Sequence, residues 1–304
     1  MRIAIAGSSG LIGSKLVEYF RGQGHSVTRI VRDRTVTKLG DPIIRWDIQS
    51  RTIEVEKLES HDAIINLAGV NLADQLWTEA HKNAISESRV EGTAFLSQTL
   101  ARLKRPPALF FSASAIGYYG PQSPAVEISE DSPRGQGFLA QVCGMWEKAT
   151  QAAEAVHTRV INMRLGMVVS SKGGALGKML PAFRAGCGGK LGSGQQVMSW
   201  IALEEIPRIM THIIQNDSIS GPVNFTSPNP VSNAEWTRTL GKVLFRPTFF
   251  SVPAGLVKIM FGEMGKELLL EGARVMPKKL LESGYAFAYE GLEDALRRIL
   301  KEGL

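Results

Sequence analysis

The chain has 304 residues, 44% hydrophobic and 21% charged, which is ordinary globular composition and fits one large α/β domain or a large domain with a smaller one. Its 35 basic and 29 acidic residues give a net charge of +6, and because the basic residues are scattered, they argue against nucleic-acid binding. Only two cysteines occur, Cys143 and Cys187, and no histidine pair has helical spacing, so neither a disulfide framework nor a metal site is expected.

No apolar run approaches the roughly 18 residues that span a bilayer. The first expected strand starts at residue 2, which leaves no room for a signal peptide. From the sequence we therefore expect a soluble, cytoplasmic protein without a membrane partner.

The N-terminal residues combine a strand, a glycine-spaced turn and the start of a helix. The apolar strand pattern Arg2-Ile3-Ala4-Ile5-Ala6 leads directly into Gly7-Ser8-Ser9-Gly10-Leu11-Ile12-Gly13. Glycines here allow a tight turn and close approach of the backbone to a diphosphate, which the first amides of the helix can bind. The pattern predicts a dinucleotide cradle made by Gly7, Ser9, Gly10, Leu11, Ile12 and Gly13, with an ordinary strand-to-helix turn as the alternative.

Strands and helices alternate over the next 150 residues. Further strand patterns fall at 25–31, 43–46, 62–67, 108–112 and 159–165. Helical patterns lie between them, at 76–103 and 138–155. Such alternation is typical of βαβ units, so we predict an α/β fold with a Rossmann-type, doubly wound parallel sheet over residues 1–169.

From about Ser170 the texture of the sequence changes, because glycine and proline become frequent and the elements become shorter. We expect residues 170–304 to form a smaller C-terminal α+β domain on the substrate side of the nucleotide site, with chain segments that interleave. Its helices are expected at 203–214, 232–244, 253–270 in two pieces, and 291–301.

These motifs resemble those of the extended short-chain dehydrogenase/reductase superfamily, which includes nucleotide-sugar epimerases and dehydratases. The glycine turn resembles its cofactor loop, Trp46-Asp47-Ile48 its adenine-contacting pair, and Asn66-Leu67-Ala68-Gly69 its fourth-strand motif. Arg89-Val90-Glu91-Gly92-Thr93 resembles a helix motif that usually begins with asparagine. The segment from Phe111 to Gly120 resembles the one that carries the catalytic serine, matched here by Ser114.

More narrowly, the chain resembles an atypical epimerase-family branch, the family-39U-like proteins, which carry a C-terminal domain of unknown function. The resemblance covers nearly the whole chain. Members of the superfamily often dimerise through a four-helix contact, so a possible homodimer would use helices such as those at 78–102 and 138–155. The segments that carry it are Glu130-Asp-Ser-Pro133, Arg164-Leu-Gly-Met-Val168, Gly192-Ser-Gly194, Ser199-Trp-Ile201, Leu270-Glu-Gly and Gly284-Tyr-Ala-Phe287.

The end of the second strand bears on the choice of cofactor. Arg32 follows Val31, where a plain NAD site has an acidic residue for the ribose hydroxyls. A guanidinium pairs with a 2′-phosphate, so NADP(H) is expected, unless Arg32 only ends a strand in solvent. The resemblance places further cofactor contacts at Val31, Asp47, Leu67, Ala68, Gly69, Arg89 and Met167. A surface salt bridge is the alternative role for Arg89.

The residues that usually transfer the proton are missing. Redox chemistry in this superfamily uses a tyrosine and a lysine four residues later, so that the ammonium lowers the pKa of the phenol. No tyrosine of this chain has a lysine at that spacing, and alignment by the helix after Pro133 puts Phe138 and Val142 at the two positions. Neither side chain titrates.

Two classes of function follow. In the first, the chain is an NADP(H)-dependent epimerase- or reductase-like oxidoreductase with an altered site, in which Ser114 with Tyr118 or Tyr119 polarises a carbonyl of an unidentified small-molecule substrate. In the second, it is a non-enzymatic NADP(H)-binding or sensing protein; a structural domain with a vestigial pocket is a third reading. Ser114 can alternatively satisfy backbone groups, the tyrosines can pack in a wall, and Glu147 can pair with an arginine. Met198 and Trp200 line a pocket or belong to the core.

Overall fold

A computed structural model describes residues 1–32 and 42–301 and contains one large sheet. Its eight strands lie in the order β13-β8-β6-β5-β1-β2-β3-β4. All neighbours are parallel except β3 and β4. The strands are β1 (Arg2–Ala6), β2 (Ser26–Arg32), β3 (Ile43–Asp47), β4 (Thr52–Ile53), β5 (Ala63–Asn66), β6 (Leu109–Ala115), β8 (Arg159–Leu165) and β13 (Gly221–Phe225). The predicted α/β fold with a doubly wound parallel sheet is confirmed.

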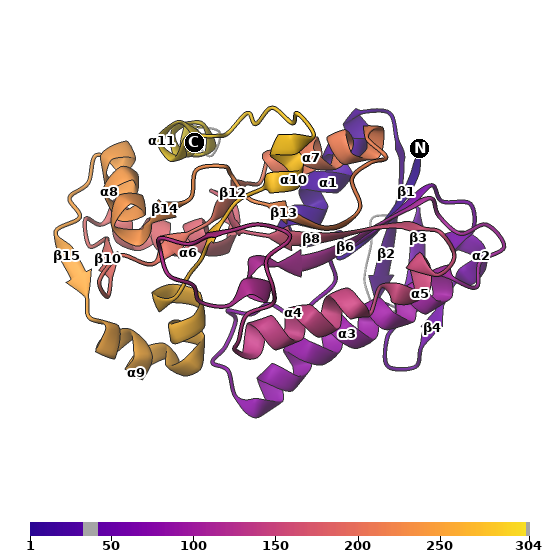
Figure 1. Cartoon of the computed structure of the whole chain (residues 1–304), viewed down its shortest axis with the longest axis horizontal. Coiled ribbons are helices and arrows are strands. Elements are labelled where there is room, and N and C mark those ends of the chain that lie inside the picture. The colour runs from indigo at the N-terminus through magenta and orange to yellow at the C-terminus, as the bar shows by residue number, and fades with distance from the viewer. Residues whose placement is uncertain (33–41, 302–304) are drawn as a thin grey trace.

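Helices cover both faces of this sheet (Figure 1). One face carries α1 (Leu11–Gly22) and α7 (Glu205–Gln215), and the other carries α2 (Val55–Leu58), α3 (Glu79–Leu100), α4 (Phe138–Lys148) and α5 (Gln151–Glu154). Alternate residues of β1 enter different cores: Ile3 and Ile5 pack with α1 and α7, whereas Ala4 and Ala6 pack with α3. Since both faces of a parallel strand are buried, β1 is apolar from Ile3 to Ala6.

The remaining residues that the structure describes form four small two-stranded sheets and short helices. The sheets pair β9 (Met167–Ser170) with β12 (Trp200–Ala202), β10 (Gly189–Leu191) with β15 (Phe250–Val252), β11 (Val197–Met198) with β14 (Val231–Ser232), and β7 (Glu127–Ile128) with β16 (Arg274–Val275). The helices are η1 (Ile116–Tyr119), α6 (Gly174–Arg184), α8 (Asn233–Leu244), α9 (Ala254–Gly265), η2 (Lys266–Leu270), α10 (Lys278–Glu282) and α11 (Leu292–Lys301).

A third apolar core holds the C-terminal elements together. Trp200 is fully buried in it beside Trp236 of α8, so Trp200 is a core residue, and Met198 packs against the same core while partly exposed. Yet β13, far beyond residue 170, is the edge strand of the main sheet, next to β8. The two parts of the chain therefore interleave, and the division at residues 169 and 170 remains a prediction.

Two of the elements that were not predicted contain a residue that argues against them. Helix α6 carries Pro181 in its interior, and proline removes a hydrogen bond from a helix. Strand β13 contains Pro222, which is acceptable in an edge strand. The helix expected over 138–155 is divided into α4 and α5.

Across residues 1–32 and 42–301, no helix combines the length and apolar character needed to cross a bilayer. In the same residues no group of His, Cys, Asp and Glu is arranged to hold a metal ion. Both cysteines are free thiols, with Cys143 buried and Cys187 exposed.

Candidate functional site

The glycine turn between β1 and α1 is so tightly packed that it excludes side chains at two positions. Gly7 has a φ of +74°, and a Cβ there would lie 2.7 Å from the carbonyl carbon of Leu67. A Cβ at Gly13 would lie 2.2 Å from the carbonyl oxygen of Gly7. The Gly10 amide donates to that same oxygen at 3.1 Å and closes the turn. The turn therefore brings Gly7 against Leu67 and Ala68, as the cofactor prediction requires.

Helix α1 begins directly behind this turn. Its N-cap residue, Gly10, has no side chain to accept from the first amides, which leaves them available to an anion. A cavity of about 350 Å³ adjoins the start of the helix. Its walls include Ser9, Gly10, Leu11, Lys172 and Gly173.

The residues expected at the adenosine end lie at neighbouring strand ends. Val31 is buried and Arg32 is exposed at the last position of β2, where Arg32 pairs in register with Trp46. Asp47 is the next residue of β3, and its carboxylate accepts from the Gln49 amide at 2.8 Å. The Asp47 carboxylate thus stabilises the turn that follows β3, next to the residue that pairs with Arg32.

Arg89 of α3 lies beneath the loop that follows β5. A Cβ at Gly69 would be 3.4 Å from its Cζ, and its guanidinium lies 5.2 Å from the centre of the Trp146 ring. Its Nη1 donates to the Ile85 carbonyl at 3.2 Å. Burial lowers the pKa of this guanidinium, and no carboxylate of the described residues pairs with it. The alternative of a surface salt bridge is therefore not observed, and Arg89 can serve as an anion partner.

Met167 is the first residue of β9, beyond the end of β8. Its amide donates to the Ser199 carbonyl at 2.9 Å, and its side chain is partly exposed. It lies at the carboxyl edge of the sheet, the edge from which the glycine turn also leaves β1.

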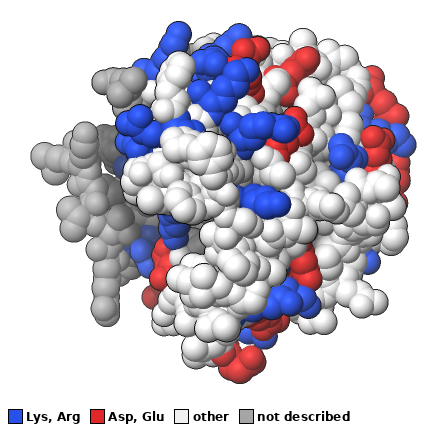
Figure 2. Space-filling view, turned by 90° about the vertical axis from the view of Figure 1, so that its left-hand side faces the viewer, with Lys and Arg blue, Asp and Glu red and all other residues white. Residues whose placement is uncertain are grey.

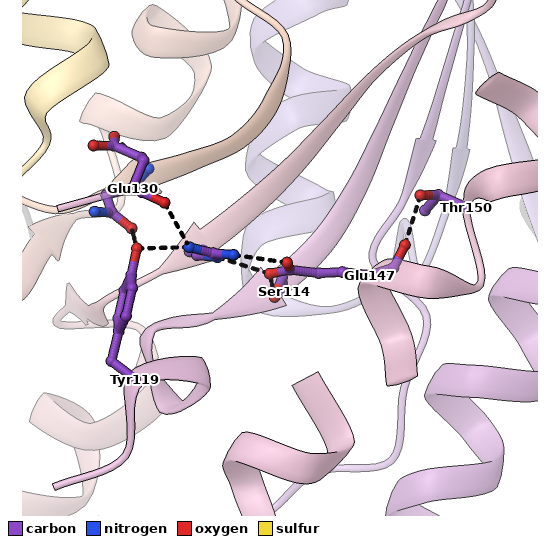
Figure 3. A network of polar contacts seen from close by, with 7 residues as sticks. Ser114, Tyr119, Glu130, Glu147 and Thr150 are labelled. Atoms are coloured by element: carbon purple, nitrogen blue, oxygen red, sulfur yellow. Dashed lines mark hydrogen bonds and ion pairs between the residues drawn. The ribbon is translucent and has the colours of Figure 1, made fainter. Parts of the chain in front are cut away.

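A cluster of polar side chains crosses the buried face of the sheet beside α4 (Figure 3). Ser114, Arg164 and Asn224 share one register position on β6, β8 and β13. The Ser114 hydroxyl donates to Oε1 of Glu147, on α4, at 2.7 Å. Arg164 donates to both carboxylate oxygens of Glu147, each at 2.8 Å. The alternative that Glu147 pairs with an arginine is therefore observed.

The other side of the Arg164 guanidinium meets two tyrosines. Its Nη1 donates to the Tyr119 hydroxyl at 2.8 Å, and its Cζ lies 3.6 Å from the centre of the Tyr118 ring. The Tyr119 hydroxyl donates to Oδ1 of Asn224 at 2.7 Å. The backbone amide of Asn224 donates to Oε1 of Glu130 at 3.0 Å, which links the cluster to the loop before α4.

Burial controls the protonation of this cluster. It raises the pKa of Tyr119 to about 12 and outweighs the opposing effect of Arg164. It also raises the pKa of the neighbouring Cys143 thiol to about 12. Burial opposes the charge of Arg164, but the hydrogen bond and attraction of Glu147 outweigh it, and the pKa of Arg164 lies above its usual value. At neutral pH the phenol and the thiol stay protonated, so neither is a base.

The two positions where a tyrosine and a lysine are expected offer no acid or base. Phe138 begins α4 and packs edge-on against Trp77, with ring centres 5.2 Å apart, and Val142 is buried. The amides of Phe138 and Leu139 donate to the Glu267 carboxylate, each at 3.2 Å. A distant residue thus caps α4.

A second cavity, of about 370 Å³, lies on the outer side of the cluster. Tyr118 and Glu147 contribute to its wall, whereas Ser114 is only 1% exposed. The remaining wall residues are Arg134, Gly144, Lys148, Gln151 and Glu154.

Sequence reasoning gave no role to Arg164, Glu130, Asn224 or Glu267. Arg164 carried a signal, because an arginine within the apolar strand Arg159–Leu165 must find a partner when the strand is buried. The other three carry no local signal, since their partners are far away in the sequence.

Comparison with known proteins gives two matches to protein families. Residues 3–225 match the NAD dependent epimerase/dehydratase family, and residues 252–299 match a domain of unknown function, DUF1731. An epimerase family protein of Mycobacterium bovis is 41% identical over 294 residues, which cover 97% of this chain and 96% of that protein.

Two solved structures extend the likeness to the whole fold. The crystal structure of human epimerase family protein SDR39U1 (isoform 2) with NADPH has a TM-score of 0.88 and 32% identity, and the match covers 99% of each chain. A nucleoside-diphosphate sugar epimerase of Corynebacterium glutamicum has a TM-score of 0.80 and 32% identity, over 99% of this chain and 58% of that chain.

Proposed function

Because the chain belongs to the NAD-dependent epimerase/dehydratase family, we propose that it binds NADPH between β1 and α1 and does not use the tyrosine and lysine chemistry of epimerases. One observation carries the binding: the glycine turn admits no side chain at Gly7 or Gly13 and lies beside a loop under which the Arg89 guanidinium has no carboxylate partner among the described residues. A backbone cradle with a nearby cation fits a dinucleotide diphosphate.

Different residues are assigned to different parts of the cofactor. The first amides of α1, at Leu11 and Ile12, hold the diphosphate, and Arg32 pairs with a 2′-phosphate. Arg89 adds a second positive charge. The remaining contacts come from Val31, Asp47, Leu67, Ala68, Gly69 and Met167. NADPH supplies a hydride when bound, and the protein supplies binding and orientation.

The contacts of Ser114 favour a structural role over the predicted catalytic one. Its hydroxyl is buried and donates to Glu147, whose carboxylate already accepts two hydrogen bonds from Arg164. A hydroxyl committed in this way is not free to polarise a substrate carbonyl. We infer that Ser114 holds the carboxylate and that the chain catalyses no 4-epimerisation of common nucleotide sugars.

Carbonyl reduction is a second candidate, favoured by the cavity that Tyr118 and Glu147 share. A small carbonyl compound there would meet the Tyr118 phenol, whose ring is held by Arg164. This enzyme and a non-catalytic NADPH sensor share the cradle and differ only in whether the bound cofactor is consumed.

The binding proposal is tested by titrating the protein with NADPH and NADH. We expect tighter NADPH binding, and we expect Arg32→Ala to weaken NADPH by about tenfold, a loss of about 1.4 kcal/mol, while NADH changes little. Equal affinities of the wild-type protein for NADPH and NADH would contradict the proposed preference for NADPH.

Catalysis is tested by following NADPH absorbance with a panel of carbonyl compounds. Turnover that Tyr118→Phe abolishes and Ser114→Ala leaves intact supports reduction at the cavity. Tight binding without turnover supports the sensor. Turnover lost in Ser114→Ala at unchanged stability would contradict the structural role of that residue.

A further inference from the structure

The C-terminal part exposes an unusual number of large apolar side chains at one end of the molecule. Phe249 is 91% exposed, Ile259 84% and Phe245 81%, and Phe250, Leu256 and Met260 are also exposed. They come from the end of α8, from β15 and its approach, and from α9, which lie together at the left of Figure 1. We call these six residues the apolar end. Apolar groups concentrated in this way mark an interaction site.

Helix α9 has the composition of a buried helix in an exposed position. The run from Ala254 to Phe261 contains a single charged residue, Lys258, yet of α9 only Val257, Met264 and Gly265 are buried. A helix that is apolar all around is normally covered on every side. Within residues 1–32 and 42–301, nothing therefore covers the outer side of α9.

Phe245 is another apolar residue that the fold of this chain does not explain. It caps α8 in the left-handed conformation, with φ 54° and ψ 44°, where glycine or asparagine fits at lower cost. Its ring is almost fully exposed and contributes little to the core. Neither helix capping nor packing favours phenylalanine here, whereas contact with an apolar environment outside the protein does.

The segment that carries the apolar end has charges of one sign only, between two glutamates that bound it. Between Glu235 and Glu263 the sequence contains Arg238, Lys242, Arg246 and Lys258 and no acidic residue. Arg238 and Lys258 are exposed and have no ionic partner among the described residues, and Lys242 pairs with Glu293 at the surface. Figure 2, which faces this end, shows a broad uncharged surface with blue groups within it and both blue and red groups around it.

From this combination we propose that the apolar end binds the surface of a bilayer containing anionic lipid. The proposal departs from the expectation of no membrane partner, which rested on the lack of a spanning segment and not on the exposed surface. Phenylalanine, isoleucine and methionine side chains enter the boundary between headgroups and acyl chains, and the basic residues pair with lipid phosphates. A two-fold contact between two copies would instead place the same cations against each other, which is unfavourable. The surface lies on α8, β15 and α9, away from the cradle, so it does not depend on NADPH binding.

The test is flotation of the full-length protein with lipid vesicles. Vesicles of phosphatidylcholine with phosphatidylglycerol should bind the protein, vesicles of phosphatidylcholine alone should bind at least about tenfold less, and high salt should release it. The double variant Phe249→Ser/Ile259→Ser should lose binding by about tenfold or more. Lys258→Glu should reduce binding to the anionic vesicles by at least about fivefold.

Leu76→Ser is the matched control, because Leu76 is 53% exposed and lies in the N-terminal half. This variant should bind the anionic vesicles as well as the wild type does. Unchanged circular dichroism and unfolding midpoints show that the variants fold. Equal binding to both kinds of vesicle would overturn the proposal in favour of non-specific adhesion. If the protein does not bind vesicles but forms a dimer that Phe249→Ser/Ile259→Ser dissociates, the apolar end is a self-association surface instead.

Discussion

The cradle at the start of the chain and the polar cluster around Arg164 are built in opposite ways. The cradle consists of backbone: its function needs the absence of side chains at Gly7 and Gly13. The cluster consists of side chains, and Ser114, Glu147, Arg164 and Asn224 meet only because three strands and a helix place them together. Both lie on one sheet, but one is local in the sequence and the other is not.

This difference separates the groups that we propose hold the cofactor from the groups that hold the protein together. Backbone amides at a helix start remain available to a bound anion. The hydrogen-bonding groups of the cluster are largely satisfied by each other, which stabilises the packing of β13 and α4 on the sheet but leaves little for a substrate. We expect substitutions in the cluster to act on stability, and those in the cradle to act on binding as well.

The largest effect should follow removal of one partner from the buried ion pair. Arg164→Met leaves the Glu147 carboxylate with the Ser114 hydrogen bond but without its cation, and we expect a loss of about 3–5 kcal/mol in the free energy of unfolding. Urea denaturation measures it. The double variant Arg164→Met/Glu147→Leu should recover much of the loss, because no charge then remains buried. A single variant as stable as the wild type would show that the pair is solvated.

Gly13→Ala should have the next largest effect. Its methyl group would lie 2.2 Å from the Gly7 oxygen, so the turn must shift, at a cost of about 1–3 kcal/mol and at least about tenfold in NADPH affinity. Gly22→Ala is the control in the same helix, because its methyl group meets nothing within 4 Å. That variant should be as stable as the wild type or slightly more stable. Equal behaviour of the two variants would contradict the packing of the turn.

Ser114→Ala should be milder. It removes one hydrogen bond to a charged acceptor while the two bonds from Arg164 remain, so we expect a loss of about 1.5 kcal/mol and unchanged NADPH affinity. Thermal unfolding and a cofactor titration measure the two quantities. A variant of normal stability with altered cofactor binding would place Ser114 in the cradle.

The smallest effect concerns pH and the edge of the cluster. Burial raises the pKa of Glu130 above its usual 4.5, so the folded state holds its proton more tightly, and stability falls as pH rises through the folded-state pKa. The neighbouring Asp131 is exposed and its pKa is lowered by Lys278, so its contribution is present at neutral pH and is lost on acidification. Glu130→Gln should lessen the fall in unfolding free energy above pH 4.5, whereas Asp131→Asn should lessen the loss in acid. Identical pH profiles for both variants would rule out this assignment.

The sequence by itself determined the glycine turn, the alternation of strands and helices, and the residue types at Phe138 and Val142, neither of which titrates. These features are local: a turn between adjacent elements, a hydrophobic period, or a residue type at one helix position. Apolar β1 and the amphipathic α1 indicate the parallel sheet before any tertiary contact is known.

Only the tertiary structure decided what Ser114, Glu147 and Arg89 contact. Ser114 and Glu147 are 33 positions apart, and Arg164 lies 17 beyond Glu147, so no local pattern shows that the hydroxyl, the carboxylate and the guanidinium meet. Strand β13 likewise joins the sheet from far along the chain, because pairing with β8 satisfies an edge that no neighbouring segment reaches. The same holds for the apolar end, since a sequence lists apolar residues but burial in three dimensions decides which of them remain exposed.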